Sequence, residues 1–180
     1  NFTRLGYRLN EIILAVDGGA TKTVMTIRTV DGQTLFSATS TGSNYQAIGR
    51  ERVQQVLELL FLQASEVITE RTITVAVFAI AGIDTEEDAR IVREITEASI
   101  TNSPFTVEKL IVENDVEATL LGIANGQPTT LLISGTGAIC FSFNGNKTVR
   151  AGGWGHRVGD EGSGYWIGQQ VAKAIFRAAD

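Results

Sequence analysis

The sequence predicts an α/β fold in which a mixed sheet is flanked by helices. Apolar and β-branched runs, typical of strands, alternate with segments whose apolar residues recur every three or four positions, as in amphipathic helices. A three-strand meander with a glycine-rich first turn occurs twice. We therefore expect a duplicated architecture whose second copy is truncated.

Residues 11–125 are predicted to form one complete lobe. Asp31-Gly32 marks a hairpin inside an antiparallel meander. Later strands are apolar enough for a sheet that is covered on both faces. We expect strands at 11–16, 23–30, 34–40, 72–79 and 107–112, a polar loop at 41–49, and helices at 50–68, 85–99 and 115–124. Residues 1–10 are expected to form a leader.

Residues 126–180 are predicted to form the beginning of another lobe. Asn125-Gly126 and Pro128 end the preceding helix. Strands are expected at 129–133, 138–143 and 147–151, and a helical pattern begins directly after Glu161. The chain begins at Asn1 and stops within this pattern, so we expect it to be a piece of a longer protein.

Composition excludes several classes of function. The 180 residues are 43% hydrophobic and carry a net charge of −5 without a basic cluster, which argues against nucleic-acid binding. No run of 18 apolar residues occurs, so no membrane span is expected. The single cysteine, Cys140, is predicted to be buried and allows no disulfide framework within one chain. A reducing, cytoplasmic location is expected.

Residues 151–168 carry the strongest functional signal. This stretch, AGGWGHRVGDEGSGYWIG, holds seven glycines, two tryptophans, the only histidine and an Asp-Glu pair. Glycine allows close approach of the backbone to a ligand, while Asp160, Glu161 and Ser163 suit the start of a helix. We expect a ligand-facing loop that leads into a helix, although a structural turn is the alternative. His156 lacks neighbouring metal ligands and is expected to structure the loop.

Two turns could hold phosphate. Asp17-Gly18-Gly19-Ala20-Thr21-Lys22-Thr23 lies between two predicted strands, and Ser134-Gly135-Thr136-Gly137 occupies the matching place in the second meander. Successive backbone N–H groups in such turns form anion-binding nests. Asp17 could hold Mg²⁺ through its water shell. Each turn alone is also compatible with an ordinary hairpin.

Two further polar segments are candidates. Asn114-Asp115 follows a predicted strand, so Asp115 could accept a proton from a substrate hydroxyl, while a helix N-cap is the simpler interpretation of the pair. Asn44, in Ser43-Asn44-Tyr45, can both donate and accept hydrogen bonds, as the recognition of sugar hydroxyls requires. A solvated turn is its alternative.

The motifs DGGATKT, SNY, AIAGI, ENDVEA, ISGTGA and GGWGHRVGDEGSGYWIG occur in an order that resembles the N-acetylglucosamine kinases. These belong to the wider BadF/BadG/BcrA/BcrD ATPase group of the actin-like sugar kinase superfamily. The resemblance covers residues 11–180. It implies two ribonuclease-H-like (actin-like ATPase) lobes that bind ATP and a sugar in the cleft between them.

The resemblance also implies roles for individual residues. Asp115 matches the base that deprotonates the sugar 6-hydroxyl, and Asp17 matches an acidic residue near Mg²⁺. The first loop that binds the phosphates of ATP matches Gly18, Gly19, Thr21 and Lys22. The second such loop matches Gly135, Thr136 and Gly137. Positions around the bound amino sugar match Asn44, Ala81, Gly82, Trp154, Gly155 and Asp160. The chain stops before the adenosine-binding segments, so the 180 residues alone are expected to be nearly inactive.

Two other functions stay open at this stage. An ATP-driven activator of a reductase or dehydratase would need cysteines for an iron–sulfur cluster, and Cys140 is the only one here. A non-catalytic sugar sensor would keep the fold without the chemistry. The exact amino sugar, the oligomeric state (a homodimer included) and regulation are not readable from the sequence.

Overall fold

The computed structural model describes residues 11–179, so the predicted leader at 1–10 lies outside the described residues. Two compact units make up the chain and divide between Ala118 and Thr119. The elements, in order, are β1 (Ile12–Gly18), β2 (Lys22–Thr29), β3 (Thr34–Thr41), α1 (Tyr45–Ile48), α2 (Arg50–Val67), β4 (Thr72–Ile80), α3 (Glu86–Thr101), β5 (Thr106–Asn114), α4 (Asp115–Ala124), β6 (Thr129–Ser134), β7 (Ala138–Phe143), β8 (Thr148–Gly152) and α5 (Gly164–Ala179).

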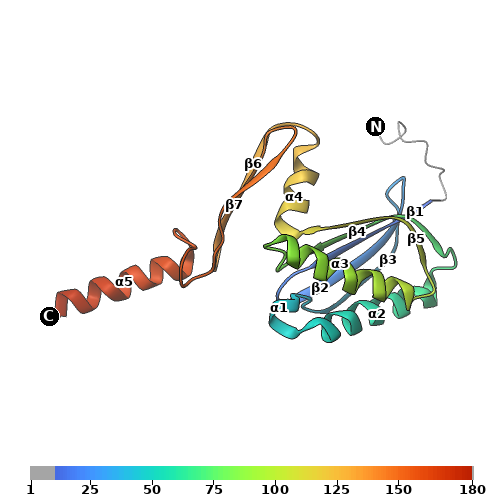
Figure 1. Ribbon diagram of the computed structural model, residues 1–180, viewed down its shortest axis with the longest axis horizontal. Coiled ribbons are helices and arrows are strands. Elements are labelled where there is room, and N and C mark those ends of the chain that lie inside the picture. Colours follow the sequence, from blue (N-terminus) through green and yellow to red (C-terminus); the bar gives the residue numbers. More distant parts are fainter. Residues whose placement is uncertain (1–10, 180) are drawn as a thin grey trace. The chain divides into compact units, whose positions relative to one another are not determined.

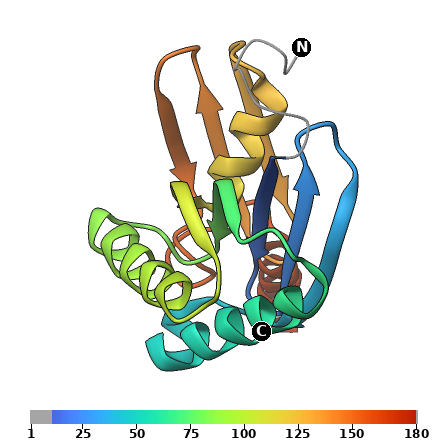
Figure 2. The same ribbon diagram turned by 90° about the vertical axis from the view of Figure 1, so that its right-hand side faces the viewer.

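The first unit is a five-stranded mixed sheet in the order β3-β2-β1-β4-β5. The β1–β2 and β2–β3 pairs are antiparallel, which confirms the predicted meander, and the β1–β4 and β4–β5 pairs are parallel. Helices α2 and α3 pack against each other and lie on one face of this sheet (Figures 1 and 2). The expected mixed sheet with flanking helices is therefore confirmed.

The core of the first unit lies between this sheet and α2 and α3. Alternate residues of β1, with Ile12, Leu14 and Val16 among them, point into the core and are buried. The ring of Phe61, from α2, meets two other aromatic rings, with centroids 6.3 Å from Phe78 of β4 and 5.9 Å from Phe105. This aromatic cluster fixes α2 to the sheet and to the segment that leads into β5.

Two predictions for the first unit are wrong. The strands β4 and β5 are not buried on both faces: alternate residues of β4 are only half-buried, and Glu108 and Lys109 of β5 are exposed. The reason is that β5 is an edge strand and the two packed helices cover a single face. The predicted loop at 41–49 also contains a helical turn, α1, because the side chain of Asn44 accepts a hydrogen bond from the backbone N–H of Gln46.

The second unit contains the three-stranded antiparallel sheet β6-β7-β8 and the helix α5. The second predicted meander is thus confirmed. Helix α5 begins at Gly164. The hydroxyl of Ser163, the residue before it, accepts a hydrogen bond from the backbone N–H of Trp166. Cys140 is half-buried in β7 rather than buried, because few elements cover this sheet among the residues described.

No helix in the stretch from residue 11 to residue 179 has the length and apolar character needed to cross a bilayer.

Replacing Phe61 with alanine should destabilise the protein by about 3–5 kcal/mol, because it leaves a cavity between two aromatic rings. Its neighbour Leu62 is 58% exposed, so Leu62→Ala should cost less than about 0.5 kcal/mol. Chemical denaturation of both variants measures the difference. Equal losses would show that Phe61 is not central to the core.

Candidate active site

The carboxyl ends of three parallel strands meet at one edge of the five-stranded sheet. In the register of the ladder, Gly18 of β1 pairs with Ile80 of β4, and Ile80 pairs with Asn114 of β5. The segments that follow these three residues carry the first glycine-rich turn, Ala81-Gly82 and Asp115. Ligands of open α/β sheets bind outside such strand ends, so the fold gathers three predicted site segments where a ligand is expected.

The first glycine-rich turn is closed by its own backbone. The N–H of Gly19 donates to the carbonyl of Lys22 at 2.9 Å, and the side chains of Thr21 and Lys22 are exposed. A hydroxyl and an ammonium group at a tight turn are suitable partners for a phosphate group. The turn predicted from the sequence is therefore present with its polar side chains open to solvent.

Two other segments form hydrogen bonds to the backbone of this turn. The N–H of Ala81 donates to the carbonyl of Gly18 at 2.7 Å, and the N–H of Ser43 donates to that of Gly19 at 3.0 Å. The contact leaves no room for a side chain: a Cβ on Gly18 would lie 2.3 Å from the hydroxyl oxygen of Ser43, and one on Gly42 would lie 2.1 Å from the carbonyl oxygen of Ala20. Gly42 was not among the predicted site residues, although its place before the Ser-Asn-Tyr motif is a signal.

Asn44 and Gly82, two predicted sugar-site residues, lie in contact. The side-chain oxygen of Asn44 caps α1 by accepting from the N–H of Gln46 at 2.9 Å. Gly82 has a φ of +88°, and a Cβ there would lie 2.6 Å from the same oxygen of Asn44. Position 82 therefore requires glycine both for its backbone conformation and for this close approach.

Asn114 is the N-cap of α4, as the simpler interpretation of the sequence predicts. Its side-chain oxygen accepts from the N–H groups of Val116 at 2.9 Å and Glu117 at 3.2 Å. Its amide nitrogen donates to the carbonyl of Ile83 at 3.1 Å. Asn114 thus connects the start of α4 with the loop after β4, and Asp115 is left as the first residue of the helix.

The environment of Asp115 raises the pKa of its carboxyl group. Burial raises the pKa of this carboxyl, and the charges of Asp17 and Asp84 raise it further. A hydrogen bond from the N–H of Val116, at 3.0 Å, acts in the opposite direction without cancelling the shift. Asp17 and Asp115 are therefore close enough to interact across the strand ends.

The carboxylates of Asp17 and Asp115 limit the kinds of metal ion that this site can bind. Among residues 11–179, no group of three or more His, Cys, Asp or Glu side chains is placed to hold a metal ion. Mg²⁺, however, usually keeps several waters and needs only one or two protein carboxylates. The exposed carboxylate of Asp17, near Asp115, fits a magnesium ion that is bound through water.

In the second unit, the turn at 134–137 packs against the glycine-rich segment that precedes α5. The N–H of Gly135 donates to the carbonyl of Gly137 at 2.9 Å, and the N–H of Gly164 donates to the carbonyl of Gly135 at 2.8 Å. The hydroxyl of Ser134 donates to the carbonyl of Gly162 at 3.0 Å. The second predicted phosphate turn and the most informative stretch of the sequence therefore form one cluster.

Asp160 lies at the centre of this cluster. It is buried, has a φ of +61°, and accepts a hydrogen bond from the N–H of Gly155 at 3.3 Å. A Cβ on Gly137 would lie 2.9 Å from its other carboxylate oxygen. Asp160 therefore joins the predicted phosphate turn to the loop that carries Trp154 and Gly155.

Trp154 presents an aromatic surface at the edge of the cluster. Its side chain is 63% exposed, and the guanidinium of Arg150 lies 4.6 Å from its ring centroid. Arg150 also donates to the carbonyl of Gly153 at 2.6 Å. The ring of His156 meets that of Tyr165 edge-on at 4.8 Å, which agrees with its expected role in structuring the loop.

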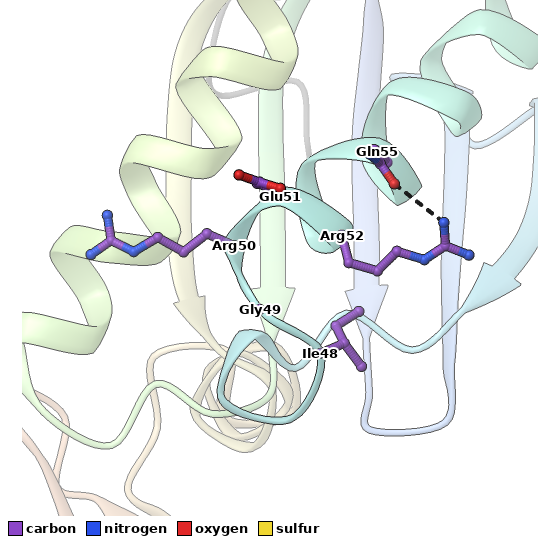
Figure 3. Close-up of a pocket in the computed structure, with 6 residues that line it drawn as sticks. All are labelled: Ile48, Gly49, Arg50, Glu51, Arg52 and Gln55. Carbon is purple, nitrogen blue, oxygen red and sulfur yellow. Dashed lines mark hydrogen bonds between the residues drawn. The ribbon is translucent and has the colours of Figure 1, made fainter.

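An open pocket of about 410 Å³ lies elsewhere in the first unit, at the start of α2 (Figure 3). Its lining residues are Ile48, Gly49, Arg50, Glu51, Arg52 and Gln55. The side chains of Arg50 and Arg52 point to opposite sides, toward Glu94 and Gln55 at 3.4 and 3.2 Å. None of the predicted site residues lines this pocket.

Known proteins resemble the chain in sequence. The sequence profile of the BadF/BadG/BcrA/BcrD ATPase family matches residues 14–180. An N-acetylmuramic acid/N-acetylglucosamine kinase of Clostridium acetobutylicum is 34% identical over 171 residues, and an N-acetyl-D-glucosamine kinase of Dictyostelium discoideum is 30% identical over 184 residues. The alignments cover 93% and 94% of this chain but 54% and 56% of the relatives, so the chain spans about half their length.

Solved structures show the same fold. A candidate N-acetylglucosamine kinase from Chromobacterium violaceum has 28% sequence identity and a TM-score of 0.62, covering 91% of this chain and 56% of that one. A second, from Porphyromonas gingivalis, has 23% identity and a TM-score of 0.69, with 93% and 57% covered. The predicted actin-like sugar kinase fold is confirmed by these likenesses.

Replacing Gly42 with alanine should destabilise the protein by about 1–3 kcal/mol, because the new Cβ collides with the backbone of the first glycine-rich turn. Gly122 offers a matched control: it lies in α4 with nothing within 4 Å of an added Cβ. Gly122→Ala should stabilise by about 0.5–1 kcal/mol. Chemical denaturation of both variants provides the test, and no loss from Gly42→Ala would refute the tight contact.

Proposed function

Because this chain belongs to the BadF/BadG/BcrA/BcrD ATPase family, we propose that the protein is an ATP-dependent kinase of amino sugars. It transfers a phosphoryl group to the 6-hydroxyl of N-acetylglucosamine or a related amino sugar. The observation that carries the proposal is the meeting of three groups at one sheet edge: the turn after β1, the Asn44–Gly82 contact and the basic carboxylate of Asp115. The kinase names of the two curated relatives support it.

In this proposal each glycine-rich turn is a phosphate-binding element for ATP. In the first unit, Thr21 and Lys22 provide a hydroxyl and an ammonium group beside Gly18 and Gly19, which keep the turn free of side chains. In the second unit, Thr136 provides a hydroxyl between Gly135 and Gly137. Asp17 would hold Mg²⁺ through water, and the ion would neutralise part of the negative charge on the phosphates of ATP, the phosphoryl donor.

Asp115 acts as the general base. Its ionised carboxylate accepts the proton of the sugar hydroxyl as the oxygen attacks the phosphorus. A raised pKa suits this role, because a more basic carboxylate accepts a proton more readily. Asn114 keeps Asp115 at the first position of α4 through its hydrogen bonds to Val116 and Glu117.

The sugar is recognised by polar backbone and amide groups. Asn44 provides a donor and an acceptor next to Gly82 and Ala81. Gly82 has no side chain, so its backbone allows a pyranose to approach closely. In the second unit, Trp154 provides a flat apolar surface, and Gly155 and Asp160 provide polar groups. The only cysteine in the sequence, Cys140, is half-buried in β7, which gives no support to the alternative of a cluster-bearing activator.

Replacing Asp115 with asparagine should lower kcat for amino-sugar phosphorylation by roughly 10²- to 10⁴-fold, because the general base is lost. KM for the sugar should change little. Steady-state assays of ADP release by the full-length protein, with Mg-ATP and a panel of amino sugars, measure both constants. Glu117→Gln is a matched control, since it removes an acid from the same first turn of α4 and should leave kcat unchanged.

The pH dependence of the same assay reports the ionisation of the Asp115 carboxyl group. Its ionised form is the active one and its pKa is raised, so kcat/KM should fall with decreasing pH through a pKa above the usual 3.8. Asp17→Asn removes a neighbouring negative charge and should move this limb to lower pH. Undiminished turnover by Asp115→Asn would contradict the assignment of the base.

A further inference from the structure

Asp88 is a buried acid whose two carboxylate oxygens serve different parts of the first unit. It is the third residue of α3 and is only 8% exposed. One oxygen faces the start of its own helix, and the other faces the segment around α1, more than 40 residues earlier in the chain. Asp88 was not among the residues predicted from the sequence.

The oxygen Oδ2 completes a capping box at the start of α3. It accepts hydrogen bonds from the N–H of Thr85 at 2.8 Å, the hydroxyl of Thr85 at 2.7 Å and the N–H of Asp84 at 3.1 Å. The hydroxyl of Thr85 in turn accepts from the N–H of Asp88 at 3.2 Å. This arrangement is a common device for starting a helix, and it accounts for one of the two oxygens.

The oxygen Oδ1 holds the segment that carries Asn44. It accepts hydrogen bonds from the hydroxyl of Tyr45 and from the side-chain amide of Gln46, the latter at 3.3 Å. The same amide donates to the carbonyl of Gly82 at 3.1 Å. The two residues after Asn44 are therefore tied both to Asp88 and to the backbone that Asn44 contacts.

Helix α1 depends on such outside contacts. It is four residues long and has no buried residue, and a helix this short is not stable by itself. The capping oxygen of Asn44 closes its first turn, while the hydrogen bonds from Tyr45 and Gln46 attach it to α3 and to the loop after β4. Together with the buried Ser43, whose N–H donates to the carbonyl of Gly19, and the packing of Tyr45 against the core, these bonds fix Asn44 beside Gly82.

The charge of Asp88 makes these bonds strong. Burial raises the pKa of this carboxyl, but the hydrogen bonds from Tyr45, Thr85 and Gln46 outweigh it and lower the pKa to about 2. The hydrogen bond to Asp88 is also the main reason why the pKa of Tyr45 is raised, so the hydroxyl keeps its proton. A hydrogen bond to an ionised acceptor is about twice as strong as a neutral one.

We propose that Asp88 is a positioning residue of the sugar site, which fixes Asn44 against Gly82 through Tyr45 and Gln46. The inference rests on the proposed function, because it takes the Asn44–Gly82 contact as part of the sugar-binding surface. Asp88 itself does not need to touch the sugar. Its Oδ1 oxygen sets the position of the segment, and its Oδ2 oxygen caps the helix.

Two variants separate the two oxygens. In the full-length protein, Tyr45→Phe removes a donor to Oδ1 and should raise KM for the amino sugar roughly 2- to 10-fold, with kcat and KM for ATP little changed. Thr85→Ala removes the hydroxyl partner of Oδ2 and leaves its two backbone N–H donors, so it should lower the melting temperature and leave KM unchanged. Asp88→Asn should raise KM, and adding Tyr45→Phe to it should raise KM little further, because both changes act on one contact.

Hydrogen exchange tests the positioning without relying on turnover. The amides of residues 44–49 should exchange faster in Tyr45→Phe than in the unsubstituted protein, and Thr85→Ala should leave their rate unchanged. Equal exchange in the unsubstituted protein and Tyr45→Phe, or the same KM change from Tyr45→Phe and Thr85→Ala, would overturn the proposal. An unsubstituted protein that phosphorylates no sugar would contradict the proposed function, while exchange at 44–49 would still decide whether Asp88 fixes the segment.

Discussion

The parallel pairing of β1, β4 and β5 is the constraint on which the site depends. It aligns Gly18, Ile80 and Asn114 in one row, so that the segments after them leave the sheet at the same edge. The buried face of the sheet fixes this register, because a slip by one residue would turn Leu14 and Phe78 out of the core. Core packing far from the strand ends therefore determines which polar groups meet there.

Two acids in the first unit have opposite environments and opposite proposed tasks. Burial raises the pKa of both carboxyl groups. Two nearby carboxylates raise the pKa of Asp115 further, whereas hydrogen bonds to both oxygens of Asp88 lower its pKa to about 2. A carboxylate that must take up a proton benefits from the first environment, and one that must stay charged and hold its partners benefits from the second. The contrast supports giving the chemistry to Asp115 and the positioning to Asp88.

Local sequence signals predicted the elements well and the tertiary contacts less well. Helix α4 and strand β7 have the bounds expected from periodicity and turn residues, and Asn114 caps its helix as expected. The predicted burial of β5 was wrong, because an apolar run does not reveal that its strand lies at an edge. Asp88 and Gly42 were missed because their partners, Tyr45 and Ala20, lie 43 and 22 residues away in the sequence.

In the proposed function, these groups serve phosphoryl transfer to the 6-hydroxyl of an amino sugar. Phosphorus NMR of the product formed by the full-length protein from Mg-ATP and N-acetylglucosamine tests it most directly. Phosphate at the primary 6-hydroxyl, visible as coupling to two methylene protons, is the predicted result. Phosphate at another hydroxyl would contradict the assigned acceptor, and the absence of any sugar phosphate, with N-acetylglucosamine or with related amino sugars, would contradict the kinase itself.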